Sequence, residues 1–478
     1  MVNAVSSLGI VFTVVVGTIL FALFSLRRIA MSPQEYIVGG RGFGAVFLWV
    51  LLAGEIYTSF TFLGAAGWTY GFGAPAFYIM AYGTVGYIFG YFLLPRIWQI
   101  GKERGLLTAP DFFSARYGNK PLATFAALVY AVSILPYVTL QLSGLQIFLT
   151  YAGYGRVDAQ LGAIISFVAI VLFVFATGLR GTAWASIIKD ALVIGALLFV
   201  GLAIPIQFFG SPVTMFDQMM RAHPSALVLG SATAPKGTIW YVSTVLLTGI
   251  GFFMGPHSVA AAYSAKDASV LRRNAMLLPV YQLIMLLVFF AGFSALLIAP
   301  GLTGTAVDQS FLVVVQRFYP SWVLGFVCAA GALCSLIPST ALLLSAASIL
   351  AKNIAGDLFS IALSDRNRVI LTRTLVAALG LGALVLWIAL KTTLVSMLLL
   401  YYNGITQFAP AFFLGFFWRR TTTAGVATGL IAGITLAVFL ASRSIAPFGI
   451  NPGFIALTLN VTLAITISLL TKTKEPAI

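Results

Sequence analysis

Charged residues are scarce in this sequence of 478 residues, of which 8% are charged and 60% are hydrophobic. A soluble domain carries about 25% charged residues, so the composition excludes an ordinary soluble protein. Apolar runs of about 20 residues recur along the whole chain, which indicates a polytopic membrane protein. The net charge of +15 would suit nucleic acid. However, the basic residues lie in short connections between apolar runs, and we therefore expect no nucleic-acid partner.

Cysteine and histidine are also rare, with two of each. Cys328 and Cys334 lie in one apolar run and form no metal or redox motif, so we interpret them as core thiols. The sequence has no cluster of a nucleophile and a base and no set of metal ligands, so we expect neither an enzyme nor a cofactor. The first apolar run has no basic residue before it and is followed by Arg27 and Arg28. This differs from a cleaved signal peptide and predicts a retained helix.

The apolar runs predict an all-α polytopic membrane protein with about 13 transmembrane helices. The predicted spans are 5–26, 45–69, 76–97, 121–151, 159–179, 183–207, 238–262, 276–299, 321–351, 369–390, 393–417, 424–442 and 451–471. With the N-terminus outside and the C-terminus cytoplasmic, 20 of the 27 Lys and Arg residues face the cytoplasm. That asymmetry is typical of inner (plasma) membrane proteins, and no connection is long enough for a soluble catalytic domain.

Spans two to six and seven to eleven make two groups of five, and the groups have opposite orientations because five is odd. Each group opens with a glycine-rich helix, "LLAGEIYTSFTFLGAAG" and "LLTGIGFFMGPHSVAAAY". Paired, interrupted helices are typical of transporters with inverted five-helix repeats and a site near the membrane midplane. The expected segments are an N-terminal helix and lead-in (1–44), a first repeat (45–207), an extracytoplasmic loop (208–237), a second repeat (238–417) and two C-terminal helices (418–478).

The first glycine-rich helix contains an acid and four hydroxyl side chains, namely Glu55, Tyr57, Thr58, Ser59 and Thr61. Its glycines favour unwinding, which frees backbone carbonyls and amides to line a cavity rather than lipid. The hydroxyl groups then supply neutral ligands for a small polar solute or a cation.

Four stretches resemble the sodium/solute symporter family across nearly the full length of the chain. They are "EYIVGGRGFG" (35–44), "LPRIWQIGKERGLLTAPDFFSARYG" (94–118), "GPHSVAAAYSAKDASVLRRNA" (255–275) and "NGITQFAPAFFLGFFWRRTTTAGVATGLIAG" (403–433). Within that family, "GGRGFG", "LLAGEIYTSFTFLG" and "LPYVTLQLSG" (135–144) are most similar to the bacterial monocarboxylate permease branch.

The resemblance implies a leucine-transporter-like fold with one extra N-terminal and two extra C-terminal helices, for which a monomer is sufficient. It also implies import of a small organic anion, such as lactate or pyruvate, by alternating access in the bilayer. Thr61 corresponds to a substrate-facing position and Gln407 to a substrate-contacting glutamine. Tyr137 and Gln141 either line the pathway or bind helices together. The predicted substrate-binding set is therefore Thr58, Ser59, Thr61, Tyr137, Gln141 and Gln407.

The same resemblance implies a sodium site with carbonyl ligands near Gly54 and Tyr57, and the sequence departs from it in two places. Ile337 and Pro338 replace the usual hydroxyl pair, although Ser335 and Ser339 are close by. Ser186 replaces an acid of an accessory site, and Lys189 follows one turn later.

Lys189 lies about 13 Å past Arg180 along a helix, and Glu55 lies about 16 Å past Gly44, at ~1.5 Å per residue. Charged residues at such depth are functional candidates, and these two could pair or share a proton. We interpret Asp190 and His257 as structural residues.

We therefore expect coupling to H⁺, or at least independence from Na⁺, with Gly54, Glu55, Tyr57, Ser186, Lys189, Ser335, Pro338 and Ser339 as the coupling residues. The alternative is a sodium-coupled symporter of another small organic solute, with sodium near Gly54, Tyr57, Ser335 and Ser339. A membrane sensor with a transporter fold is a further alternative, which we disfavour because no signalling domain follows Leu470 in the sequence.

Overall fold

The computed structural model describes residues 2–27, 39–54, 56–232, 236–361 and 364–472. Within these ranges the chain is helical and has no β-strand, and one isolated bridge pairs Phe43 with Ala265. The all-helical expectation is confirmed. Glu55 lies outside the described residues, so its predicted role and its predicted pairing with Lys189 stay predictions.

The main helices fall into two groups, before and after Gly210. Those before it are α1 (Val2–Leu26), α3 (Ala45–Gly54), the π-helix η2 (Phe60–Gly64), α4 (Ala65–Phe72), α5 (Tyr78–Glu103), α6 (Asp111–Tyr117), α7 (Lys120–Ser133), α8 (Leu135–Ala152), α9 (Ala159–Leu198) and α10 (Ile204–Phe209). The following ones are α11 (Pro212–Ala222), α12 (Thr238–Gly251), α13 (Pro256–Ser264), α14 (Ala268–Gln282), α15 (Leu286–Ile298), η7 (Gly304–Gln309), α16 (Ser310–Phe318), α17 (Ser321–Ile349), η8 (Leu350–Leu358), α18 (Asp365–Ala389), α19 (Leu394–Ile405), α20 (Ala409–Phe417), α21 (Thr423–Ser442) and α22 (Pro452–Leu470).

Nine helices of the described part are long and apolar enough to cross a bilayer, and α12 with α13 forms a tenth candidate bent by 42°. The predicted spans 159–179 and 183–207 both fall on the helical stretch Ala159–Phe209. That stretch is interrupted at Gly178, whose φ of 54° and ψ of −168° are not helical and favour glycine. The number of crossings and the inverted repeat stay predictions.

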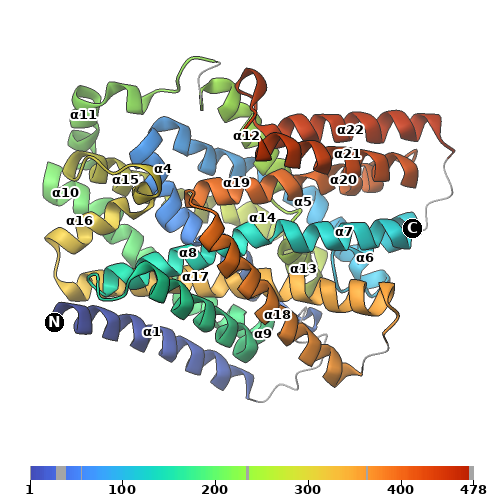
Figure 1. Ribbon diagram of the computed structural model, residues 1–478, viewed down its shortest axis with the longest axis horizontal. Helices are drawn as coiled ribbons and strands as arrows, with labels where there is room; N and C mark the ends of the chain where they lie inside the picture. Colours follow the sequence, from blue (N-terminus) through green and yellow to red (C-terminus); the bar gives the residue numbers. More distant parts are fainter. Residues whose placement is uncertain (1, 28–38, 55, 233–235, 362–363, 473–478) are drawn as a thin grey trace.

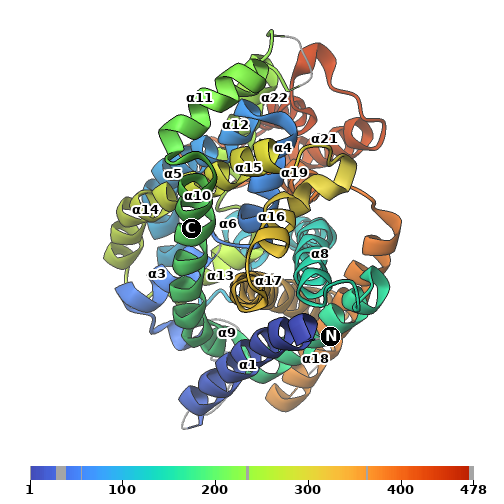
Figure 2. The same ribbon diagram turned by 90° about the vertical axis from the view of Figure 1, so that its left-hand side faces the viewer.

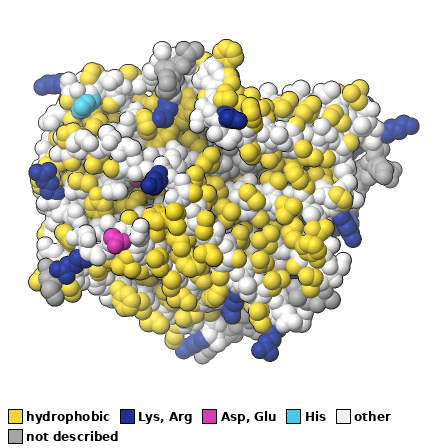
Figure 3. Space-filling view, in the orientation of Figure 1, with side chains coloured by type: hydrophobic (Ala, Val, Ile, Leu, Met, Phe, Trp, Pro, Cys, Tyr) yellow, Lys and Arg dark blue, Asp and Glu magenta, His cyan; other side chains and the backbone are white. Residues whose placement is uncertain are grey.

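The core of the molecule is built around α17, whose most apolar 18-residue stretch is entirely buried, whereas α1 and α18 lie at the periphery. Peripheral helices expose large apolar side chains, for example Phe12 (70%) and Ile388 (65%). Hydrophobic side chains dominate the face in Figure 3, and its few Lys and Arg side chains lie mostly near the outline. A surface of this kind matches the hydrocarbon of a bilayer.

The long helices run along the horizontal axis of Figure 1, where α1 begins at one end of the molecule and α22 ends at the other. In Figure 2, α17 and α8 are seen nearly end-on. Short helices cap both ends. We call the end with α10, α11 and α16 the α11 end, and the end with α6 the α6 end. The sequence predicts that the α11 end is outside and that the α6 end is cytoplasmic.

Candidate transport site

The first glycine-rich helix is interrupted between α3 and η2, as its glycines predict. The hydroxyl of Thr61 lies across this break. It accepts a hydrogen bond from the backbone N–H of Thr58 (2.8 Å), and its oxygen lies 2.7 Å from the carbonyl of Ile56 and 3.0 Å from that of Thr58. Thr58 in turn accepts from the N–H of Phe60 (3.2 Å). Both threonine side chains thus replace hydrogen bonds that the interrupted helix lacks.

Ser59 connects the break to two other helices. Its hydroxyl lies 2.6 Å from the hydroxyl of Ser335 in α17, and its backbone N–H donates to Oε1 of Gln141 in α8 (3.3 Å). Gln141 is fully buried, and its Nε2 has no hydrogen-bond partner among the described residues. Gly144 makes this convergence possible, because a side chain there would collide with Ser59. The structure therefore brings together Ser59, Gln141 and Ser335. Gln141 Nε2 is a hydrogen-bond donor that none of the described residues uses.

The second interruption lies between α12 and α13, from Gly251 to Gly255. The Tyr401 hydroxyl and the His257 ring both lie against Gly255 and leave no room for a side chain. The ring of Tyr137 lies 5.0 Å from that of Tyr401 and 6.0 Å from that of His257. His257 is the second residue of α13, whose N-terminus carries a partial positive charge. A buried polar and aromatic cluster therefore surrounds this break.

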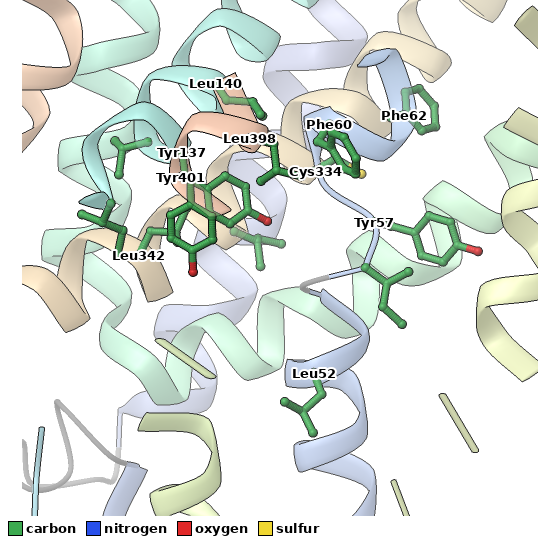
Figure 4. Close-up of a cluster of buried hydrophobic side chains, with 14 of the residues drawn as sticks. Leu52, Tyr57, Phe60, Phe62, Tyr137, Leu140, Cys334, Leu342, Leu398 and Tyr401 are labelled. Atoms are coloured by element: carbon green, nitrogen blue, oxygen red, sulfur yellow. The ribbon is translucent and has the colours of Figure 1, made fainter. Parts of the chain in front are cut away.

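Tyr57 is directed away from this cluster. Figure 4 shows Tyr137 and Tyr401 side by side, whereas Tyr57 points in another direction. The Tyr57 hydroxyl donates to the carbonyl of Tyr281 (2.8 Å), and the two rings lie 4.8 Å apart. Its side chain therefore anchors the break to α14, and the predicted role of its carbonyl as a cation ligand is untested.

Lys189 lies in α9, and its side chain ends beside Gly54, the last residue of α3. Its side chain is fully buried, and its Nζ lies 2.9 Å from Oδ1 of Asp190. A Cβ atom added to Gly54 would lie 3.4 Å from Lys189 Nζ and 3.7 Å from the hydroxyl of Ser186. Lys189 Nζ thus lies close to Gly54, one of the two residues near which the family resemblance implies carbonyl ligands of a sodium ion. The neighbouring Asp190, rather than another helix, supplies the described counter-charge.

The other predicted coupling residues lie in α17, which continues helically through Pro338. Because proline has no N–H, the carbonyl four residues earlier, that of Cys334, loses its usual helical donor. Ser339 donates to the carbonyl of Ser335 (2.6 Å), so its hydroxyl is used within the helix. Among these residues, Ser335 reaches the first break.

Gln407 is not gathered with the other predicted substrate residues. Its Nε2 donates to the carbonyls of Asn403 (3.2 Å) and Gly453 (3.1 Å), and its Oε1 accepts from Asn460 (3.2 Å). These contacts direct the side chain toward α22. The sequence offered a signal for this contact, because an asparagine inside an apolar helix needs a polar partner.

A polar cluster at the α6 end was not predicted. The α6 clamp consists of Asp111, Thr108, Lys352 and Asn353. Asp111 Oδ1 lies 2.6 Å from Lys352 Nζ and accepts from Asn353 (2.8 Å), and its Oδ2 accepts from the N–H groups of Leu107 and Thr108. The clamp joins the connection after α5 to the end of α17. Its signal in the sequence was the acidic position of "TAPDF".

The comparisons with known proteins agree with this architecture. The model of the sodium:solute symporter family matches residues 36–433. An uncharacterised symporter of Bacillus subtilis, YhjB, is 36% identical and covers 99% of this chain and 98% of its own length. The monocarboxylate transport permease protein of Rhizobium johnstonii is 26% identical and covers 93% and 91%. A Na⁺-coupled sialic acid symporter, solved in a substrate-bound, outward-open state, has a TM-score of 0.79 at 16% identity and covers 98% of both chains. At that identity the likeness shows the fold alone.

Proposed function

Since the chain belongs to the sodium:solute symporter family and is therefore a secondary transporter rather than an enzyme, we propose that it imports a short monocarboxylate such as lactate or pyruvate. The Rhizobium relative, which is named for monocarboxylate transport, supports this choice of solute. The anion would bind where the two interrupted helices meet α8 and α17, and alternating access would expose it first to one side of the membrane and then to the other.

The observation that carries this proposal is the amide of Gln141. Its oxygen is occupied by Ser59, while its buried Nε2 has no partner among the described residues. A buried donor without an acceptor costs free energy, and a carboxylate is a strong acceptor for it. The hydroxyls of Ser59 and Ser335 lie at the same point. Thr58, Thr61 and Tyr137 remain predicted contacts, and we leave Gln407 outside the proposed site.

Counterflow of labelled lactate or pyruvate in proteoliposomes tests the solute. The variant Gln141→Glu keeps an oxygen that accepts from Ser59 but replaces the donor with an acceptor. We expect at least a tenfold loss of affinity, about 1.4 kcal/mol, for a monocarboxylate. Gln146→Glu on the same helix is the matched control, because Gln146 donates to Thr150 instead. Equal counterflow by both variants would remove Gln141 from the site.

We further propose that transport is coupled to protons, or at least is independent of sodium. The buried side chain of Lys189 beside Gly54 supports this, because a sodium ion near Gly54 would lie close to another basic group. Proton coupling would act through the contact between α9 and the end of α3, where Lys189 pairs with Asp190.

Uptake driven by an imposed pH gradient in sodium-free vesicles tests the coupling. Lys189→Gln should abolish pH-driven uptake yet leave counterflow, which needs no net proton movement. Lys391→Gln at the α11 end is the control and should retain both activities. If a pH gradient drove uptake by the Lys189 variant at the wild-type rate, this lysine would have no role in proton coupling.

A sodium-coupled symporter of another small organic solute is the second candidate. The hydroxyl contact between Ser59 and Ser335 favours it, since hydroxyl oxygens suit a sodium ion. Sodium would then lie near Gly54, Tyr57, Ser335 and Ser339. In that case Ser335→Ala should raise the sodium concentration needed for half-maximal uptake at least tenfold, whereas a proton-coupled transporter would show no such change.

A further inference from the structure

The connection between α15 and α16 carries an acidic residue that the proposed transport site does not use. Asp308 lies in η7, outside the membrane-spanning helices, and it is only 2% exposed. In Figures 1 and 2, α4, α15, α16 and the start of α19 gather at the α11 end of the molecule. Asp308 thus lies in a short helix between the first interrupted helix and one of the last helices of the predicted second repeat.

The Asp308 carboxylate makes one hydrogen bond within the described residues. Its Oδ2 accepts from the N–H of Leu394, the first residue of α19, at 2.8 Å. Its Oδ1 is buried and has no donor among the described residues. A Cβ atom at Gly67 of α4 would lie 2.7 Å from the Asp308 Cα and 2.8 Å from its Oδ1. Asp308 therefore contacts both helices closely, and α4 needs a glycine to allow this.

The groups that face Asp308 do not supply a counter-charge. Tyr70 of α4 donates to the carbonyl of Ala299 (2.8 Å), and Tyr151 of α8 contacts Gln309 at 2.9 Å. Lys391, before α19, lines the same cavity of about 800 Å³ as Asp308. The remaining charged groups nearby are Arg317 at the end of α16 and Lys236, which lies over the rings of Trp68 and Phe72 of α4. In the described part of the chain, no basic nitrogen lies within 4.0 Å of the Asp308 carboxylate.

We propose that Asp308 is a proton-binding site that holds the α11 end closed. A proton from that side binds Oδ1 when η7 closes over α4 and the start of α19. When η7 lifts, the carboxyl meets water and releases the proton. This proposal rests on the alternating access of the family and is independent of the solute and of Lys189.

Burial fits this assignment, because it raises the pKa of Asp308 to about 7 although the N–H of Leu394 acts in the opposite direction. An exposed aspartate has a pKa near 4. The closed form consequently binds more protons than the open form between about pH 4 and 7. Its population falls by up to about tenfold for each pH unit as the pH rises through that range. Acid at the α11 end therefore favours closure.

The test follows access to a cysteine below η7 and needs no substrate. The reporter is Met397→Cys, a buried position that lines the cavity with Asp308, in a Cys328→Ala, Cys334→Ala background. A membrane-impermeant maleimide is applied to the full-length protein in vesicles from pH 5 to pH 8. Labelling of Val213→Cys, an exposed position on α11, corrects for the effect of pH on the thiol itself.

With Asp308 present, corrected labelling of the reporter should rise at least tenfold from pH 5 to pH 8. With Asp308→Asn, which keeps the acceptor for Leu394 but cannot ionise, labelling should not depend on pH. Asp217→Asn, a neutralised exposed acid on α11, should behave like the wild type. If the asparagine variant does not reach the membrane, Asp308→Ser provides the same comparison.

Two results would overturn the proposal. One is the same pH dependence with and without the carboxyl group. The other is labelling that responds to sodium at constant pH and loses that response in Asp308→Asn, because the ligand would then be a metal cation.

Discussion

Two buried aspartates at opposite ends of the molecule have opposite electrostatic surroundings. Asp111 at the α6 end receives hydrogen bonds from Asn353 and two backbone N–H groups and pairs with Lys352 at 2.6 Å. Asp308 at the α11 end accepts one backbone hydrogen bond within the described residues. Burial would raise both pKa values. Lys352 and the donors outweigh it and hold the pKa of Asp111 below its usual value, whereas the pKa of Asp308 rises to about 7.

The different pKa values of Asp111 and Asp308 show that burial alone does not decide the charge of a carboxyl group. Asp111 is a carboxylate at every physiological pH, so the α6 clamp is a permanent ion pair. Asp308 changes its charge near neutral pH, so its contact with α4 and α19 depends on the pH at the α11 end. The α6 end thus holds a fixed ion pair, whereas the contact of Asp308 at the α11 end is conditional.

The largest expected effect concerns which end is outside. Asn3 is exposed at the start of α1, which begins at the α11 end. Because the basic residues predict an external N-terminus, Asn3→Cys in a cysteine-free background should be labelled completely by an impermeant reagent added outside cells. Labelling only after the membrane is opened would exchange the two ends and reverse every statement about sidedness.

Breaking the α6 clamp should have the next largest effect. Lys352→Met leaves the Asp111 carboxylate buried without its cation, and we expect the free energy of unfolding at pH 7 to fall by about 2–3 kcal/mol. This is below the cost for a fully buried pair because the Lys352 side chain is 29% exposed. Equilibrium unfolding in mixed micelles measures the loss. Arg366→Met, an exposed position in α18, is the control.

The pH dependence of that loss has a definite sign. A carboxyl whose pKa is lowered by folding contributes stability above its ordinary pKa near 4 and loses it as the pH falls below that value. The difference between Lys352→Met and the wild type should therefore shrink at acidic pH. A difference that stays constant as the pH falls from 7 to about 2 would show that lost packing, rather than the ion pair, is responsible.

A methyl group added at Gly67 should disturb the α11 end. Gly67→Ala places a Cβ atom 2.7 Å from the backbone of Asp308, so η7 cannot seat as observed, and we expect a loss of about 1–2 kcal/mol. Gly71→Ala is a matched control one turn later, because its Cβ would meet Val307 at an ordinary 3.5 Å. The reporter at Met397 should be labelled faster in the first variant and unchanged in the second. Equal labelling of the reporter in the two variants would show that Gly67 has no role in closing the α11 end.

The smallest effect is a change in stability with pH. Because burial raises the pKa of Asp308, the wild-type fold loses stability as the pH rises from about 4 to 7. Asp308→Asn removes this loss, so its stability relative to the wild type should rise by at least about 1 kcal/mol between pH 5 and pH 8, since the limit is ~1.4 kcal/mol per pKa unit. Unfolding at both values measures the difference. A variant that is less stable at pH 8 would contradict the assignment.

The helical fold and the first break were predictable, because runs of apolar residues and glycines act locally. The hydroxyls of Thr58, Ser59 and Thr61 lie at that break as expected. The burial of Lys189 was also expected, because it lies inside an apolar run. Its contact with the neighbouring Asp190 was not predicted, and the pairing with Glu55 lies outside the described residues.

The contacts between distant segments were not predictable from the sequence. Gln407 binds α22 because Asn460 lies opposite it after folding. An asparagine in an apolar helix signals that a polar partner is needed, but it does not tell which residue supplies it. Asp308 was missed for the same reason. Its burial comes from Gly67 and Leu394, which are far from it in sequence, and in the sequence it resembles any acid in a polar connection.

The central claim, a monocarboxylate transporter that does not require sodium, is tested most directly by uptake in proteoliposomes of the unmodified protein. Labelled lactate and pyruvate are offered with an acidic exterior and potassium in place of all sodium, and then with a sodium gradient at equal pH. If transport is coupled to protons, the labelled acid should accumulate in the first condition, and this accumulation should collapse when a protonophore is added. Accumulation that occurs only with the sodium gradient, or of neither acid in either condition, would contradict it.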